Sequence, residues 1–433
     1  MKVFIGLTEI AGYCRNLKKG FQELGVDCEF INLTRHPFQY GGDDTPNSLV
    51  AFVRYSGLKR VSTPRTNIFT KIFWVGLHNI TRPILFVWAL LRYDVFIFGF
   101  HTSFLNFYDL PILKFFNKKI IYVCFGADSR PPYIGGATMA AGRVSIKQCA
   151  LLTSDKKKNV QIIDKYADVI IDYPPMAHFH RREFVLGLVI GLPSSLGKKK
   201  MHEQEIKTAG PEDSSNTVRI LHSPSHPEAK GTVIIRRVIE RLKQKGHQID
   251  FIEITGQSNE VVLNELSKCD FIIDQLYSDT PLAGFATEAA FFGKPAVVGG
   301  YYSKMIRDDI PSNIIPPSLY CHPDEIEDAI EKMIVDAEYR VRLGIDAHKF
   351  VTENWSSNKV AKKYVRIING DIPREWLYDP KQIKYVYGGG LPEERVKKII
   401  KEMVAMGTKD ALQLQDKPEL EKIMLEFANT DER

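Results

Sequence analysis

The residues with the clearest chemical potential lie between Asp270 and Gly300. The apolar run from Phe271 to Ile273 predicts a strand, and the loop after it leads into a predicted helix that begins with glycine. A loop of this kind, at the start of a helix that follows a parallel strand, suits phosphate because backbone amides and the helix dipole favour an anion. The candidate phosphate-binding residues are Gly284, Phe285, Ala286 and Thr287. Glu288, one turn into the helix, can reach a ribose hydroxyl, so the segment predicts a nucleotide-sugar site.

A second polar segment, HSPSHPEAKGT, runs from His222 to Thr232 after another predicted strand. Lys230 and Gly231 stand at the head of the next predicted helix, where the ammonium and nearby amides can meet a pyrophosphate. The alternative is a solvated loop lysine. His222 or His226 could also contact a diphosphate, or be a histidine whose hydrogen bonds are satisfied within the loop.

Two runs of alternating strands and helices must position these residues. The order of short apolar runs and helical patterns predicts an α/β fold with two Rossmann-like domains that face a central cleft. The polar stretch 196–216 predicts a linker between a first domain, 1–195, and a second domain, 217–365. Residues 366–433 predict a helical extension that packs on the two domains.

Composition limits the other possibilities. The six cysteines are scattered without a CxxC pair, so the sequence indicates neither a metal site nor disulfides, and it favours a reducing compartment. The N-terminus is typical of a first strand rather than a signal peptide, and no apolar run is long enough for a spanning helix. We therefore expect a cytoplasmic protein that needs no metal or other cofactor.

The net charge of +6 is unevenly distributed. Residues 45–93 hold seven basic side chains and no Asp or Glu, interleaved with Phe, Trp, Leu and Ile. This pattern predicts peripheral contact with an anionic membrane surface, because basic groups meet headgroups while aromatic rings enter the acyl boundary. The alternative is a buried helix pair under a basic surface. Nucleic acid is not an expected partner, because no recognised binding module accompanies the charge.

The segments HSPSHPEAKGT, DQLYSDTPLAGFATEAAFFGKPAVV and FVTENWS together resemble the nucleotide-binding half of GT-B glycosyltransferases, in particular retaining family 4. The resemblance covers roughly Val218 to Tyr364 and is looser over the first domain. It implies that Lys230 contacts the donor diphosphate, that Glu288 binds the donor ribose, and that the backbone of 284–287 holds the β-phosphate.

The chain departs from the family pattern at the catalytic positions. Thr280 stands where the family has the first of two glutamates, which makes the neighbouring Asp279 the candidate catalytic carboxylate. Phe125 stands at the family's histidine position, and His101 is a substitute histidine. The further first-domain candidates are Asp128 with Arg130, which could instead be a loop pair, and Gly12, which allows a close approach of donor or acceptor to the backbone.

The resemblance implies a glycosyltransferase that moves a sugar from a nucleotide-diphosphate donor to a glycan or polyprenyl-lipid-linked acceptor. Retention at the anomeric carbon and independence from metal are expected from the family, and the membrane-facing segment favours surface polysaccharide or glycolipid synthesis. Two alternatives remain. One is a nucleotide-sugar epimerase of the same fold, and the other is a non-catalytic partner of an assembly complex.

Overall fold

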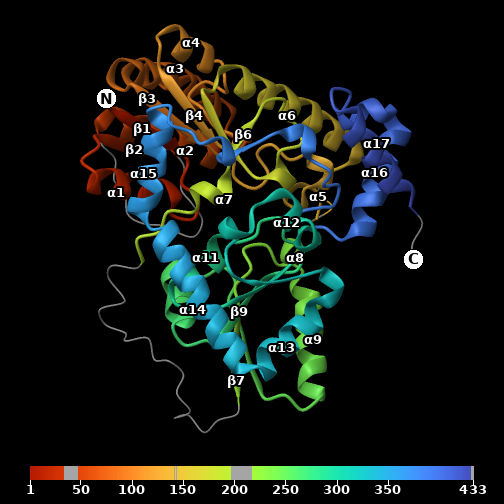
Figure 1. Ribbon diagram of the computed structural model, residues 1–433. Helices are drawn as coiled ribbons and strands as arrows, with labels where there is room; N and C mark the ends of the chain where they lie inside the picture. Colours follow the sequence, from red (N-terminus) through yellow and green to blue (C-terminus); the bar gives the residue numbers. More distant parts are fainter. Residues whose placement is uncertain (34–46, 141, 143, 197–216, 431–433) are drawn as a thin grey trace.

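The computed structural model describes residues 1–33, 47–140, 142, 144–196 and 217–430. It holds two α/β domains, the first drawn in red to yellow at the top and the second in green to cyan below (Figure 1). The expected linker, residues 196–216, lies outside the described residues except for Leu196.

The first domain is built on a seven-stranded sheet in the order β12-β6-β5-β4-β3-β1-β2. Its strands are β1 (Val3–Leu7), β2 (Cys28–Asn32), β3 (Val95–Gly99), β4 (Lys119–Val123), β5 (Val169–Asp172), β6 (Phe184–Leu186) and β12 (Leu377–Tyr378). All pairs are parallel except β12 with β6. Every residue of β1 is buried, as its continuous apolar sequence predicts for a strand covered on both faces.

The helices of the first half of the chain surround this sheet (Figure 1). They are α1 (Tyr13–Glu23), α2 (Ser48–Ser62), α3 (Ile68–Arg92), α4 (Leu110–Phe115), α5 (Gly136–Met139), α6 (Ile146–Tyr166) and α7 (Gly187–Ile190). The longest of them after α3 is α6, which begins at a capping box made by Ser145 and Gln148.

The second domain has an all-parallel sheet in the order β11-β10-β9-β7-β8. Its strands are β7 (Val218–His222), β8 (Ile249–Glu253), β9 (Phe271–Gln275), β10 (Ala296–Gly299) and β11 (Leu319–Cys321). Its helices are α8 (Pro227–Lys230), α9 (Thr232–Gln244), α10 (Asn259–Leu266), α11 (Gly284–Phe291), α12 (Ile306–Asp309), α13 (Ile326–Val335) and α14 (Ala337–Asn354). Two doubly wound domains confirm the expected fold class.

In both sheets the strand order reverses beside the domain's first strand, β1 or β7. Ligands of open α/β sheets bind outside the carboxyl ends of the strands at such a switch point. The loops that follow β1, β7 and β9 are therefore the segments that the topology itself selects for binding.

The second domain ends earlier than the expected residue 365. After α14 the chain returns to the first domain, where α15 (Ser357–Ile368) packs on α1 (Figure 1). The hydroxyls of Tyr13 and Tyr364 lie 2.7 Å apart in this contact. Lys363 fixes the crossing, because its ammonium donates to the carbonyls of Val189 (2.6 Å) and Asn354 (2.9 Å).

The C-terminal extension also builds onto the first domain. Besides β12 it contains α16 (Glu393–Gly407) and α17 (Pro418–Asn429), and α16 packs against α6. The glycine segment 388–390 contacts both domains. The N–H of Gly389 donates to the carbonyl of Ile134 and its carbonyl accepts from the N–H of Gly136, both in the first domain. The N–H of Gly390 donates to the carbonyl of Tyr277 in the second domain. The extension therefore joins the domains as well as covering one of them.

The basic segment 45–93, described from residue 47, forms the antiparallel pair α2 and α3. One face of α3 is buried through Leu85, Phe86 and Ala89, whereas Phe69 is 88% exposed. The pair is thus neither fully buried nor detached from the core. Among the described residues, no helix combines the length and apolar character that crossing a membrane requires.

Candidate active site

A cavity of about 850 Å³ lies between the two domains, at the switch points of both sheets. The first domain contributes the loops after β1, β4 and β5 together with the crossing segment near Ser194. The second domain contributes the start of α10 and the loop that leads into α11. Of the residues expected from the sequence, Gly12, Gly284, Thr287 and Glu288 line this cavity.

The N-terminus of α11 opens into the cavity. The N–H of Thr287 donates to the carbonyl of Ala283 (2.8 Å), which is the first bond of the helix. The amides of residues 284–286 therefore precede the helical hydrogen-bond ladder, as in any helix N-terminus. Gly284 lies close to the first domain. A Cβ at this position would be 3.3 Å from the Cβ of Ala11.

The N-terminus of α1 faces the same cavity but already holds an internal anion. The buried carboxylate of Glu9 accepts hydrogen bonds from the backbone N–H groups of Ile10 (2.8 Å), Cys14 (3.1 Å) and Arg15 (3.1 Å). Gly12 lines the cavity with a positive φ of 77°. Its part is thus to turn the backbone, whereas the start of α11 is the better place for a ligand phosphate. Glu9 was not a candidate from the sequence, although an acidic residue just before a helix is a capping signal.

Glu288 and Asn259 meet on the second-domain wall of the cavity. Asn259 Nδ2 donates to Glu288 Oε1 over 2.9 Å. Burial raises the pKa of the Glu288 carboxyl to about 7, and the hydrogen bond from Asn259 opposes this rise. A carboxylate beside an amide offers both an acceptor and a donor, which suits a vicinal diol such as that of ribose. The sequence did not single out Asn259 as a candidate ribose-binding residue.

Lys230 is held just outside the cavity. Its ammonium donates to Gln275 Oε1 (2.6 Å), and Gln275 Nε2 donates to Ser278 Oγ (2.6 Å). Ser278 Oγ accepts from the N–H of Thr280 (3.1 Å), a residue that lines the cavity. A chain of hydrogen bonds therefore links Lys230 to the cavity wall.

The residues around Lys230 are closely packed. Gly231 has a φ of 71°, and a Cβ there would approach Leu276 Cβ to 2.6 Å. Asp274 is buried at the end of β9, and burial raises the pKa of its carboxyl while the charge of Lys230 lowers it. Phe285 and Ala286 belong to α11 but are not among the residues that line the cavity.

His222 is fully buried with both ring nitrogens occupied. Nδ1 lies 2.8 Å from the carbonyl oxygen of Ile273, so it carries the proton, and Nε2 accepts from the Thr232 hydroxyl (3.0 Å). Burial lowers the pKa of the imidazole to about 4. This is the satisfied histidine that the sequence left open as the alternative to diphosphate contact, and it fastens β7 to β9 and α9.

The first-domain candidates Asp128 and His101 lie behind the cavity wall that Phe125 and Gly126 form. Asp128 Oδ2 accepts the N–H of Phe125 (2.9 Å), and burial raises the pKa of this carboxyl to about 7. His101 Nε2 lies 3.0 Å from Asn159 Nδ2, and burial together with the charge of Lys156 lowers the pKa of this ring to about 4. The structure brings these two residues near each other but places neither on the cavity surface.

Asp279 and Arg130 come together although they belong to different domains. Their side chains form a buried ion pair, and a Cβ on Gly389 would fall 2.3 Å from Arg130 Nη1 and from Asp279 Oδ2. Asp279 does not line the large cavity. In this structure its carboxylate pairs with Arg130 where the two domains meet. A catalytic role for Asp279 stays a prediction.

One group of potential metal ligands appears within the described residues, made of Cys124, Asp172 and His180. His180 Nε2 lies 3.0 Å from Asp172 and Nδ1 lies 2.5 Å from Asp164. Burial alone would lower the pKa of this ring, but the two carboxylates raise it to about 9, and burial raises the pKa of the Cys124 thiol. A protonated imidazole and a neutral thiol are poor metal ligands, so this group is better described as a hydrogen-bonded ion cluster.

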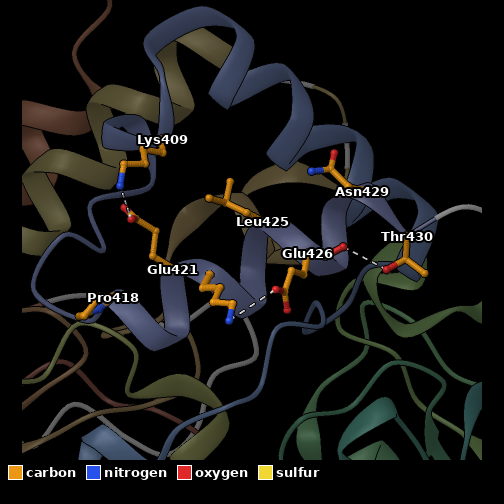
Figure 2. A pocket seen from close by; sticks show the side chains of 8 residues that line it. Lys409, Pro418, Glu421, Leu425, Glu426, Asn429 and Thr430 are labelled. Atoms are coloured by element: carbon orange, nitrogen blue, oxygen red, sulfur yellow. Dashed lines mark hydrogen bonds and ion pairs between the residues drawn. The ribbon is translucent and has the colours of Figure 1, made fainter.

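A second depression, of about 620 Å³, lies along α17 on the extension (Figure 2). Its charged groups pair with one another, since Lys409 Nζ lies 2.9 Å from Glu421 Oε2 and Lys422 Nζ lies 4.0 Å from Glu426 Oε1 (Figure 2). It lacks the two facing helix N-termini of the interdomain cavity. We therefore place the candidate site between the domains.

Comparison with known proteins adds solved structures of low similarity. No protein-family model matches the chain, and no curated protein matches it significantly by sequence. Anabaena HepE in complex with UDP is 10% identical, with a TM-score of 0.45 and coverage of 85% of this chain and 99% of that one. The catalytic domain of starch synthase IV from Arabidopsis thaliana, bound to ADP and acarbose, is 11% identical, with a TM-score of 0.47 and coverage of 86% and 99%. S. aureus MnaA with UDP is 12% identical, with a TM-score of 0.42 and coverage of 86% and 97%.

Proposed function

We propose that this protein is a glycosyltransferase that binds a nucleotide-diphosphate sugar between its two domains. The observation that carries the proposal is the cavity wall of the second domain, where the start of α11 and the Glu288–Asn259 pair face the same space. In this proposal the helix amides hold the β-phosphate, and Glu288 with Asn259 holds the ribose. The sugar then points toward the loop after β1, which forms the opposite wall.

The proposed chemistry needs a group that stabilises the leaving nucleoside diphosphate. Preorganised amides at the start of α11 and the ammonium of Lys230 supply positive potential without rearrangement. We propose that transfer is retaining and metal-independent, as the family resemblance implies, with the family's first glutamate replaced by Thr280. Asp128 and His101 would act only through the loop that Phe125 and Gly126 present to the cavity.

We further propose that the acceptor is a glycan or a polyprenyl-linked lipid, reached from an anionic membrane surface, in surface polysaccharide or glycolipid synthesis. Support comes from the apolar side chains that α3 exposes among basic residues, and from α4, where Phe115 is 81% exposed beside Lys114. Such a protein would work in the cytoplasm at the inner face of the membrane.

The test is a screen of nucleoside diphosphates and nucleotide sugars for thermal stabilisation of the full chain. A ligand that binds only the folded state raises its apparent stability, so the correct donor raises the melting temperature most. Products are then analysed with and without acceptor glycans. Conversion of the donor alone would identify an epimerase.

Absence of stabilisation by every nucleotide would instead favour a non-catalytic partner. Two observations favour this second candidate function. The candidate catalytic carboxylate of Asp279 is held in an ion pair with Arg130, and an apolar residue, Phe125, lines the cavity at the family's histidine position.

A further inference from the structure

The turn between α2 and α3 contains a depression of about 570 Å³ with an unusual lining. Three of the residues around it are basic, namely Arg60, Arg65 and Lys71. The ammonium of Lys71 donates to the backbone carbonyls of Arg60 and Thr63, the latter over 3.0 Å. These bonds tie the end of α2 to the start of α3 beside the depression.

The positive charge of this depression is not neutralised within the described part of the chain. No ion pair joins Arg60, Arg65 or Lys71 to a carboxylate there, and residues 47–93 contain no Asp or Glu. Lys71 and Val75, which line the depression, lie on the first turns of α3, a helix of 25 residues whose N-terminus carries the positive end of the helix dipole. Asn67 makes no side-chain cap there. The depression therefore attracts an anion.

Large apolar side chains surround the same turn. Val61 is 74% exposed, Phe69 is 88% exposed and Ile72 is 63% exposed. Water alone does not favour this arrangement, but a bilayer does, because phosphate groups lie directly above the acyl boundary. Leu85 and Ala89, in the C-terminal half of α3, are buried in the first domain, so the helix that carries the turn is anchored there.

We propose that this depression binds the phosphate of an anionic phospholipid headgroup while Val61, Phe69 and Ile72 enter the acyl boundary. The inference rests on the membrane contact of the proposed function and narrows it from residues 45–93 to the turn between α2 and α3. Arginine suits this role, since its planar guanidinium can hold two phosphate oxygens at once.

The full-length protein is tested by flotation with vesicles of equal parts phosphatidylcholine and phosphatidylglycerol, and with vesicles of phosphatidylcholine alone. We expect the Arg60→Gln/Arg65→Gln variant to partition onto the anionic vesicles about 30-fold less, because each of the two lost cations contributes about 1 kcal/mol near such a surface. The charge-matched control is Lys349→Gln/Lys362→Gln on α14 and α15, both exposed, which should partition like the wild type.

Two further variants separate the pocket from general charge. Arg60→Lys/Arg65→Lys keeps the charge and should still bind several-fold more weakly. Phe69→Ser/Ile72→Ser, whose side chains are exposed, should keep the wild-type circular dichroism spectrum and lose vesicle binding. Glycerol phosphate in solution should compete poorly, since it lacks the acyl chains. Strong competition would assign the pocket to a soluble phosphate instead.

The proposal is overturned if Arg60→Gln/Arg65→Gln binds anionic vesicles like the wild type, or if the control variant loses as much. Thermal stabilisation by nucleotides is measured on the same variants. Loss of vesicle binding with intact nucleotide stabilisation supports the lipid pocket independently of the donor site. Intact vesicle binding with no nucleotide response in the wild type contradicts the proposed function but not the pocket.

Discussion

Arg130 of the first domain and Asp279 of the second domain form a buried ion pair across the domain boundary, and the backbone of Gly389 closes over both side chains. Three segments far apart in the sequence therefore meet at one point. Burial lowers the pKa of the guanidinium to about 10, so the group stays charged at neutral pH. The pair fixes how the two domains meet beside the cavity.

Breaking this pair should cost stability, because it leaves one charge buried without a partner. We expect Arg130→Met to lower the free energy of unfolding by about 3–5 kcal/mol, and Arg130→Met/Asp279→Leu to recover much of that loss. Chemical denaturation of both variants and of Asp279→Leu completes a double-mutant cycle. A coupling free energy close to zero between the two positions would contradict a stabilising ion pair. A stable Asp279→Asn variant that binds nucleotide but transfers no sugar would instead support the catalytic prediction for Asp279.

The raised pKa of Glu288 predicts a pH dependence with a definite sign. The folded protein binds this proton up to about pH 7, whereas the unfolded chain releases it near the ordinary value of 4.5. Stability therefore falls as pH rises through this window. Glu288→Gln should remove this fall and make the free protein more stable at about pH 8, by at most about 3 kcal/mol.

Nucleotide binding should show the opposite trend at the same residue. In the proposed site an ionised Glu288 would accept hydrogen bonds from ribose hydroxyls, so the affinity of the wild type should rise between about pH 6 and about pH 8. Glu288→Gln should bind several-fold more weakly at the upper end and lose this dependence. Titration calorimetry checks both points. An unchanged pH profile in Glu288→Gln would exclude Glu288 from the ribose site.

Lys230 is predicted to act on the diphosphate from its place beside Gln275. Lys230→Ala should weaken nucleoside diphosphate binding by several-fold or more, through loss of charge-assisted hydrogen bonds. Gln275→Ala keeps the charge and loses only its anchor (2.6 Å), so its effect should be smaller. Lys349→Ala, at an exposed position of α14, serves as the control. Equal affinity in Lys230→Ala and the control would remove Lys230 from the site.

His180 is predicted to stabilise the first domain through its two carboxylate partners, Asp164 and Asp172. His180→Gln should lower the free energy of unfolding by about 3–5 kcal/mol, as for other broken buried pairs. Because the folded pKa of about 9 exceeds the ordinary 6.5, this contribution is complete below about pH 6.5 and disappears as pH rises past about 9. Denaturation curves over that range measure it. His247→Gln, which breaks a surface pair with Glu331, should cost less than about 1 kcal/mol.

The two alternating domains could be predicted from the sequence alone, because buried parallel strands such as β1 and β3 are continuous apolar runs of recognisable length. It also placed the start of α11 and Glu288, since glycine, a helix start and a carboxylate one turn later are local features. The sequence predicted that the second domain ends at residue 365, but α15 packs on the first domain. The apolar face of an amphipathic helix does not indicate which domain the helix covers.

Which polar groups are available to a ligand depends on contacts between residues far apart in the sequence. Glu9 occupies the start of α1, His222 is enclosed between Ile273 and Thr232, and Asp279 is paired with Arg130 of the other domain. Each outcome depends on a partner that folding brings close, and the burial that shifts the pKa of Glu288 to about 7 arises in the same way. Local sequence fixes the geometry of a helix start, whereas long-range packing fixes the charge and access of the side chains around it.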